Sequence, residues 1–88
     1  MDVFLYTSNQ HKLSELTALF SDLSVTLLSA KDLSVNVGVA ETGATFIENA
    51  LIKARDGCAQ SQMPCLADDS GLLAVSYTHL RAHETTNY

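Results

Sequence analysis

Three polar clusters in this sequence carry side chains that could bind or hydrolyse a phosphate compound. The first spans residues 7–12 (TSNQHK), between an apolar run and a helical pattern. A helix N-terminus there would offer unpaired amides and a positive dipole to an anion, and Lys12 can reach a phosphate from the first turn. An ordinary capped helix with a solvated lysine has the same pattern. The segment lacks the glycines of a P-loop.

The second cluster joins Glu41 to a helical pattern that carries Asn49 and Lys53. Asn49 and Lys53 are spaced i, i+4 and therefore share a helix face. An amide and an ammonium on one face, with a carboxylate just upstream, suit a metal–polyphosphate complex. The competing interpretation is structural, because Thr45 and Glu48 have the spacing of a capping box and Lys53 can simply be solvated.

The third cluster, Asp68-Asp69-Ser70-Gly71, follows an apolar strand pattern. Two carboxylates side by side are costly unless a cation or a shifted pKa relieves their repulsion. Mg²⁺ binds a few carboxylates together with phosphate oxygens and water, and Glu41 with this aspartate pair could supply them. The other carboxylate could take a proton from an attacking water. A solvated Asp-Asp-Ser-Gly turn is the structural alternative.

Two further groups of residues invite a metal or redox interpretation that we reject. His79 and His83 are spaced like zinc ligands on a helix, but the order is not H-E-x-x-H and no third ligand is evident. Cys58 and Cys65 lack CxxC spacing, so we expect reduced thiols in the core.

Alternating strand and helix patterns position the three clusters. Short apolar runs predict strands at residues 3–6, 24–28 and 65–67, and another apolar run begins at Leu72. Helical spacing begins at Lys12, with Ser8 or Asn9 as the cap. The apolar stripe of this helix consists of Leu13, Leu16, Leu19 and Phe20. Residues 30–40 show weak periodicity and predict an irregular connection.

A longer helix is predicted from the capping box at Thr45 to about Gln60. Met63-Pro64 should end it, because proline clashes with the preceding helical turn. The residues that it is expected to bury are Phe46, Ile47, Ala50, Leu51 and Ala54. This alternation is typical of an α/β layer fold, in which ligands gather outside the carboxyl ends of the strands.

The composition excludes several classes of function. Ten acidic against five basic residues give a net charge of −5, so no basic face is expected to bind nucleic acid. The apolar content of 47% is more than so short a chain can bury, which suggests a missing subunit or more chain. No apolar run reaches the length of a membrane span, and the N-terminus has no export signal. We therefore expect a cytoplasmic protein without membrane partners.

Together the blocks TSNQHK (7–12), ETGATFIENALIKA (41–54) and PCLADDSGL (64–72) resemble the inosine/xanthosine triphosphate pyrophosphatases. Each block is moderately specific, and their occurrence in the right order is a strong signal. The resemblance implies the N-terminal part of a mixed-sheet α/β pyrophosphatase fold, truncated. It also implies Mg²⁺-dependent hydrolysis of ITP, dITP and XTP to the monophosphate and pyrophosphate, by cleavage between the α- and β-phosphates.

The resemblance further implies a role for each matching residue. Asp69 would be the catalytic proton acceptor, and Mg²⁺ would be held by Glu41 with Asp69 and Asp68. The substrate-binding positions would be Thr7, Ser8, Asn9, Gln10, His11, Lys12, Lys53 and Ser70. The partners would be a purine nucleoside triphosphate and, in the full-length protein, a second copy in a homodimer.

The sequence departs from the family after Val75. Family members continue with an acidic, Gly-rich stretch, whereas SYTHLRAHETTNY follows here and resembles translated sequencing adapter. We expect residues 1–75 to be the N-terminal half of the pyrophosphatase domain and residues 76–88 to be a non-native tail. The 88-residue chain alone is then expected to be inactive.

Two other functions compete with this reading. One is a non-catalytic nucleotide-binding or assembly fragment. The other is a septum-associated pyrophosphatase, but that family begins with an S-x-S-P-R-R loop, which residues 7–12 do not match.

Overall fold

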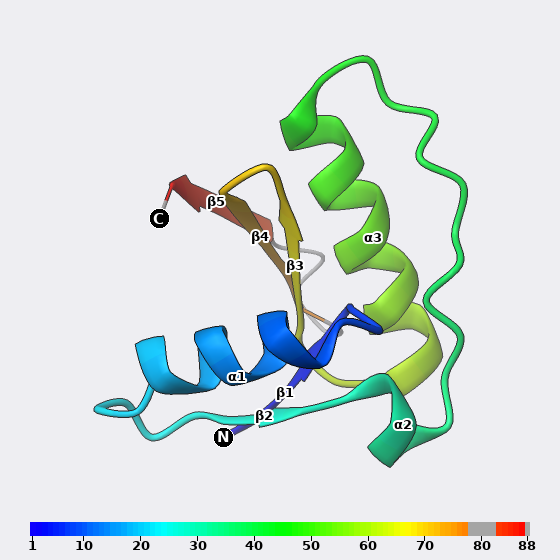
Figure 1. The fold of residues 1–88 in the computed structure, drawn as a ribbon. Helices are drawn as coiled ribbons and strands as arrows, with labels where there is room; N and C mark the ends of the chain where they lie inside the picture. The colour runs from blue at the N-terminus through cyan, green and yellow to red at the C-terminus, as the bar shows by residue number, and fades with distance from the viewer. Residues whose placement is uncertain (78–82, 88) are drawn as a thin grey trace.

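A five-stranded mixed sheet with helices on both faces organises the chain (Figure 1). The computed structural model describes residues 1–77 and 83–87. The elements in chain order are β1 (Asp2–Leu5), α1 (Gln10–Leu19), β2 (Thr26–Leu28), α2 (Ala30–Leu33), α3 (Phe46–Ser61), β3 (Cys65–Asp69), β4 (Leu72–Ser76) and β5 (His83–Asn87). The sheet order is β2-β1-β3-β4-β5. The predicted α/β class with a mixed sheet is therefore confirmed.

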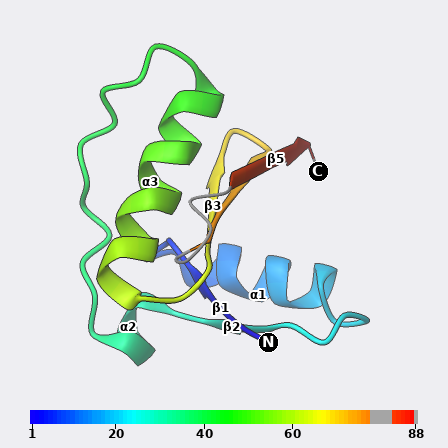
Figure 2. The same cartoon turned by 180° about the vertical axis from the view of Figure 1, so that it is seen from behind.

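The sheet changes direction at β3. Strand β1 runs parallel to both β2 and β3, whereas β4 is antiparallel to β3 and to β5. The carboxyl ends of β1 and β3 consequently meet at one edge of the sheet. Seen from behind, α1 and α3 lie on opposite sides of the strands (Figure 2).

Residues of β1 alternate between two hydrophobic cores. Phe4 and Tyr6 belong to the core under α3, whereas Val3 and Leu5 belong to the core under α1. The alternation follows from the pleat, which points successive side chains to opposite faces. Because both faces are covered, the strand reads as a continuous apolar run rather than an alternating one.

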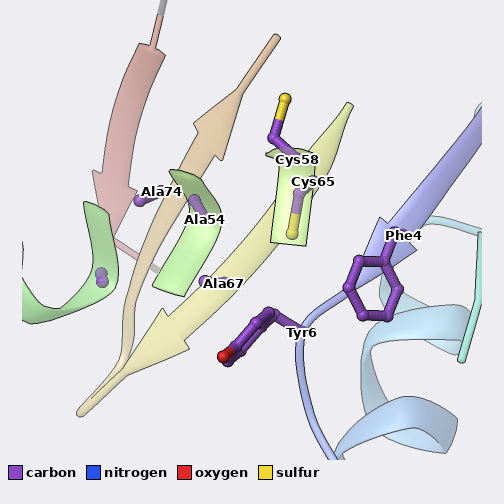
Figure 3. Close-up of a cluster of buried hydrophobic side chains, with 8 residues drawn as sticks. Phe4, Tyr6, Ala54, Cys58, Cys65, Ala67 and Ala74 are labelled. Atoms are coloured by element: carbon purple, nitrogen blue, oxygen red, sulfur yellow. The ribbon is translucent and has the colours of Figure 1, made fainter. Parts of the chain in front are cut away.

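Small side chains let α3 lie close to the sheet. Ala50, Ala54 and Gly57 recur at helical spacing and are buried. A Cβ added at Gly57 would lie 2.3 Å from Cys65 Sγ, so glycine is needed for this approach. Figure 3 shows the aromatic rings of Phe4 and Tyr6 beside this region, with their centroids 6.0 Å apart in an edge-to-face arrangement.

The two cysteines lie in the same core, and the prediction of reduced buried thiols is confirmed. Cys58 and Cys65 are both free and buried. Burial raises the pKa of the Cys65 thiol well above its ordinary range, with smaller contributions from Cys58 and Asp56. A neutral thiol is a small apolar side chain, so these residues serve packing.

The opposite face is built from larger aliphatic side chains and is incompletely filled. Leu16 of α1 is fully buried against Leu5, Leu66 and Leu73. Beyond the end of α1, a groove of about 150 Å³ lies between the strands and the segment that follows the helix, with Phe20 and Val25 among the residues that line it. Its walls are almost wholly apolar.

The structure corrects the prediction for residues 30–40. The segment begins with a short helix, α2, whose N-terminus has a capping box. The Ser29 hydroxyl accepts from the Asp32 amide, and the Asp32 carboxylate accepts from the Ser29 amide. The helix has only four residues, so it is too short to show periodicity, and the Ser-x-x-Asp spacing was its only local signal.

Three predicted core positions are exposed instead. Phe46 and Ile47 lie in the first turn of α3, before its first buried residue, Ala50. Leu19 ends α1 with 54% of its surface exposed. The predicted bounds of α3 are confirmed to within one residue, with Thr45 as the N-cap and Ser61 as the last helical residue. The reason for its end differs from the prediction, because Gln62 caps the helix in a left-handed conformation before Pro64 is reached.

Several sequence predictions concern the C-terminal residues. His79 lies outside the described part of the chain, and so does the side chain of His83, so the rejected zinc site is not tested. The expected non-native tail contains the end of β4 and all of β5, and its positions 78–82 and 88 are likewise not described. Its origin stays a prediction. No helix within the described residues is long and apolar enough to cross a membrane.

Candidate functional site

The parallel pairing of β1 with β3 brings the first and third polar clusters together. The Tyr6 amide, just after β1, donates to the carbonyl of Leu66 in β3 at 2.9 Å. Residues 7–12 therefore leave the sheet beside Asp68 and Asp69. This edge is the carboxyl end of both strands, where α/β folds place ligands.

Asn9, rather than Ser8, caps α1. Its Oδ1 accepts from the amides of His11 at 2.9 Å and Lys12 at 3.3 Å, and the Thr7 hydroxyl accepts from the Asn9 amide at 3.0 Å. The predicted cap is confirmed for one of its two candidates. Because the cap engages Oδ1, a phosphate contact from Asn9 would have to come from its Nδ2 hydrogens. Thr7 is half-buried, while Ser8, Gln10 and His11 are exposed.

Lys12 reaches from the first turn of α1 to the end of β3. Its Nζ lies 3.6 Å from Asp68 Oδ2 and 3.6 Å from Glu15 Oε1. The Asp68 side chain is only 18% exposed, so its carboxylate is more strongly held than an ordinary surface group. The lysine thus stands at the predicted position, with its charge offset by a carboxylate.

Lys53 joins the second cluster to the third. Its Nζ lies 3.2 Å from Glu41 Oε1 and donates to the carbonyl oxygen of Asp68 at 3.1 Å. The Lys53 side chain is 19% exposed and that of Glu41 is 47% exposed. Glu41 therefore lies at the rim, and Lys53 lies deeper, between α3 and the edge of the sheet. All three clusters converge.

The adjacent aspartates do not share a face of the sheet. Strand β3 continues through both of them, so the strand pleat separates their side chains. Asp68 follows Leu66 on the α1 side, which agrees with its contact to Lys12, and Asp69 follows Cys65 and Ala67 on the α3 side. The pleat separates the two carboxylates, and the Lys12 ammonium, 3.6 Å from Asp68 Oδ2, is a relieving cation of the kind that the sequence argument required.

A two-residue turn connects β3 to β4 beside these carboxylates. Asp69 pairs with Leu72, leaving Ser70 and Gly71 between the strands. Both have positive φ, 52° and 87°, as in the type I′ turns of tight hairpins. Ser70 is exposed at the tip, so the solvated turn that was the structural alternative for this motif is present, as the end of a hairpin.

The predicted metal ligands Glu41, Asp68 and Asp69 are carboxylates, which is the ligand type that Mg²⁺ prefers. No group of three or more His, Cys, Asp or Glu side chains within residues 1–77 is arranged to hold a metal. Mg²⁺ ordinarily takes one or two protein carboxylates and completes its shell with phosphate oxygens and water. Of the three predicted ligands, Glu41 and Asp69 lie on the α3 side of the edge and could bind the ion, whereas Asp68 faces the α1 side and lies 3.6 Å from Lys12 Nζ.

Backbone contacts hold the loop that carries Glu41. Asn49 Oδ1 accepts from the Gly43 amide at 2.8 Å, and Glu48 Oε2 accepts from the Ala44 amide at 2.8 Å. Glu48 thus reaches one residue farther back than the capping box predicted, although Thr45 does cap α3. Asn49 holds the loop, so its amide oxygen is already engaged.

A second anchor of this loop joins residues that are far apart in the sequence and was not predicted. The Tyr6 hydroxyl donates to Asp56 Oδ2 at 2.7 Å and accepts from the Val39 amide at 3.1 Å. Gln60 Nε2 also donates to Asp56 Oδ2, at 2.8 Å. Burial and the bond to Asp56 raise the pKa of Tyr6 to about 12. The i, i+4 spacing of Asp56 and Gln60 is the only local signal for this network.

Comparisons with known proteins agree with the architecture. The sequence model of the Ham1 family matches residues 3–80. The chain is 47% identical over 68 residues to a dITP/XTP pyrophosphatase of Photobacterium profundum, covering 77% of this chain and 34% of that protein. A protein of the same name from Escherichia coli is 46% identical over 70 residues, covering 80% of this chain and 35% of that one.

Solved structures give the same result. A Ham1 protein from Coxiella burnetii matches with a TM-score of 0.74 at 43% identity, covering 82% of this chain and 36% of the other. A dITP/XTP pyrophosphatase from Mycobacterium abscessus matches with a TM-score of 0.70 at 43% identity, covering 82% and 38%. The matched region therefore spans little more than a third of the length of these relatives.

Proposed function

The chain belongs to the Ham1 family, and from that premise we propose that the full-length protein hydrolyses ITP, dITP and XTP to the monophosphate and pyrophosphate with Mg²⁺. The names of the similar proteins support the reaction, and the three matching blocks at one edge of the sheet support its location. We place the protein in the cytoplasm, acting as a homodimer on a purine nucleoside triphosphate.

The convergence of Lys12, Lys53, Glu41 and the aspartates is the observation that carries the proposal. A triphosphate carries several negative charges, and a chain with a net charge of −5 can offset them only with a few lysine or arginine side chains placed at the site. Lys12 approaches the edge from one face and Lys53 from the other, so a polyphosphate lying along the edge would contact both. Electrostatic stabilisation of this kind is usually the largest contribution to catalysis.

The carboxylates have complementary tasks in this proposal. Asp69, on the Glu41 side of the edge, would accept the proton from the water that attacks phosphorus. Asp68 would keep Lys12 in place through their ion pair. Mg²⁺, when bound by Glu41 and Asp69, would supply positive charge to the phosphate oxygens. Ser70 and the amides near residues 7–12 would orient the substrate.

Replacement of the Asp69 carboxylate by an amide tests the proposed role of Asp69 as proton acceptor. In the full-length protein, Asp69→Asn should abolish pyrophosphate release from dITP and leave the thermal unfolding transition unchanged. Asp22→Asn, which alters an exposed carboxylate outside the site, is the matched control and should retain full turnover. Turnover of dITP by Asp69→Asn at the wild-type rate would remove Asp69 from the catalytic role.

The source locus decides which polypeptide to assay. We expect its reading frame to continue past Val75 into an acidic, Gly-rich stretch. A stop codon after Tyr88 would instead withdraw the catalytic claim and favour a nucleotide-binding or assembly fragment. That fragment would bind dITP in equilibrium dialysis without releasing pyrophosphate.

A further inference from the structure

We infer that Tyr6 is a positioning residue for Glu41, acting through a clamp that ties the loop before α3 to the sheet. The clamp consists of Tyr6, Asp56, Gln60, Asn36 and the amide of Val39. This inference rests on the proposed function, because it assigns Tyr6 a part in holding the metal-binding carboxylate.

The phenol links three segments that are distant in sequence. Tyr6 follows β1 and is only 5% exposed, Asp56 belongs to α3, and Val39 belongs to the loop. The hydroxyl donates its proton to Asp56 and accepts a hydrogen bond from the Val39 amide, so one hydroxyl group connects the helix to the loop. A protonated phenol is required for this arrangement, and its raised pKa keeps the proton in place at neutral pH.

Gln60 extends the clamp along the loop. Its Nε2 donates to the Asn36 carbonyl at 2.6 Å and to Asp56 Oδ2 at 2.8 Å, while its Oε1 accepts from the Asn36 amide at 3.2 Å. The side chain of Gln60 therefore pairs with both backbone groups of Asn36 and also steadies the carboxylate that Tyr6 uses. The Gln60 amide therefore satisfies the backbone N–H and C=O of Asn36, as a neighbouring strand would in a sheet.

Glu41 lies between two anchors of the loop backbone. Tyr6 fixes the Val39 amide two residues before it, and Asn49 fixes the Gly43 amide two residues after it. Among the described residues, the ion pair with Lys53, at 3.2 Å, is the one polar contact of the Glu41 side chain, which is 47% exposed. An exposed ion pair restrains a side chain weakly, so the two backbone anchors set where the carboxylate stands.

Removing the Tyr6 hydroxyl should release the upstream anchor and spare the core. Tyr6→Phe keeps the ring that packs edge-to-face on Phe4. Hydrogen exchange at residues 39–41 should accelerate, while exchange within α3 stays unchanged. In the full-length protein the half-saturating Mg²⁺ concentration for dITP hydrolysis should rise about three- to tenfold, in line with the loss of one hydrogen bond. Saturating Mg²⁺ should restore the rate to within about twofold of wild type.

A binding measurement separates this inference from the proposed function. Mn²⁺ binding in the presence of inorganic pyrophosphate, followed by electron paramagnetic resonance, should weaken by the same factor in Tyr6→Phe. The matched control is Ser61→Ala, which removes a hydroxyl that contacts Met63 at the far end of α3. It should alter neither Mn²⁺ affinity nor exchange at residues 39–41.

The outcomes distinguish a failure of the proposed function from a failure of the clamp. If the wild type binds Mn²⁺ but releases no pyrophosphate, the proposed function fails and the Mn²⁺ comparison still tests the clamp. Faster exchange with unchanged metal affinity would overturn the positioning role, and so would unchanged exchange. A lower rate at every Mg²⁺ concentration without a shift in half-saturation would also overturn it, since it indicates a merely structural defect. Absence of Mn²⁺ binding in the wild type would overturn it together with the role of Glu41.

Discussion

The two faces of the sheet are packed by different means. Under α3 the contact is made by small side chains, and Gly57 lets the helix approach until no room remains for a methyl group. Under α1 the contact is made by long aliphatic side chains, and a groove of about 150 Å³ stays open beside them. The close contact of α3 fixes the position of that helix on the sheet, whereas the looser packing under α1 can accommodate a change in side-chain volume. The face under α3 also carries Lys53 and the clamp on the Glu41 loop, so precision is found where the chemistry is proposed.

The largest test of this contrast is to add volume under α3. Gly57→Val should destabilise the fold by about 3 kcal/mol or more, because its Cβ would meet Cys65, Tyr6 and Phe4 within 3 Å. Urea denaturation of the full-length protein measures the change. Ala59→Val adds a similar volume on the exposed side of the same helix and should cost less than about 1 kcal/mol. Equal costs would show that the contact of α3 with the sheet is not tight.

The next effect comes from removing volume under α1. Leu16→Ala should cost about 2–3 kcal/mol, near the lower end for buried leucine, because side chains around the open groove can move into the space. Thermal unfolding monitored by circular dichroism gives the change. Leu19→Ala, at a position that is 54% exposed, should cost well under half as much. A cost of about 5 kcal/mol for Leu16→Ala would mean that this face is as rigid as the other.

A smaller effect is expected at the rim of the groove. Leu23 lines the groove and is 57% exposed, so Leu23→Lys should change stability by less than about 0.5 kcal/mol. The 88-residue chain expressed alone is expected to self-associate through its apolar surface, and the charge should reduce that association. Light scattering after size exclusion measures both species. A monomeric parent chain that melts cooperatively would show that this face needs no further cover.

The smallest effect at neutral pH concerns the Tyr6 phenol. Its pKa in the folded protein is raised to about 12 from an ordinary value of 10, chiefly by burial and then by the bond to Asp56. The protonated form is therefore favoured by folding, and its contribution to stability is complete below pH 10 and lost as the pH rises through 12. Phenolate absorbance at 295 nm should show one late step near pH 12, absent from Tyr6→Phe. Titration of all tyrosines near pH 10 would contradict the buried clamp.

The sequence predicted the location of the site better than its internal geometry. The first and third polar clusters each follow a strand, and the carboxyl ends of parallel strands lie at the same edge of a sheet, so their convergence could be inferred once a parallel sheet was expected. The separation of Asp68 from Asp69 could not, because it depends on β3 continuing through both residues. The Ser70-Gly71 pair, typical of a tight turn, was the available signal for that hairpin.

Long-range contacts account for what sequence reasoning missed. Tyr6 is 50 residues from Asp56 and 33 from Val39, and no local pattern relates residues so far apart. Helix burial was predicted correctly where α3 crosses the sheet, at Ala50 and Ala54, and wrongly in its first turn, because periodicity gives the direction of a face but not where its partner begins.

The pleat of β3 decides on which face of the sheet the proposed proton acceptor, Asp69, lies. Asp69 shares the α3 face with Cys65 and Ala67 because an even number of residues along the strand separates them. Asp68 is an odd number of residues from both and therefore lies on the opposite face. A single codon inserted between Ala67 and Asp68 would keep every side chain yet exchange the two carboxylates across the sheet. A substitution on this strand changes one side chain and leaves the others on their faces, whereas an insertion or deletion moves every later side chain of the strand to the opposite face. Apart from the proposed site carboxylates themselves, gene variants along β3 should therefore tolerate substitutions more readily than changes of length.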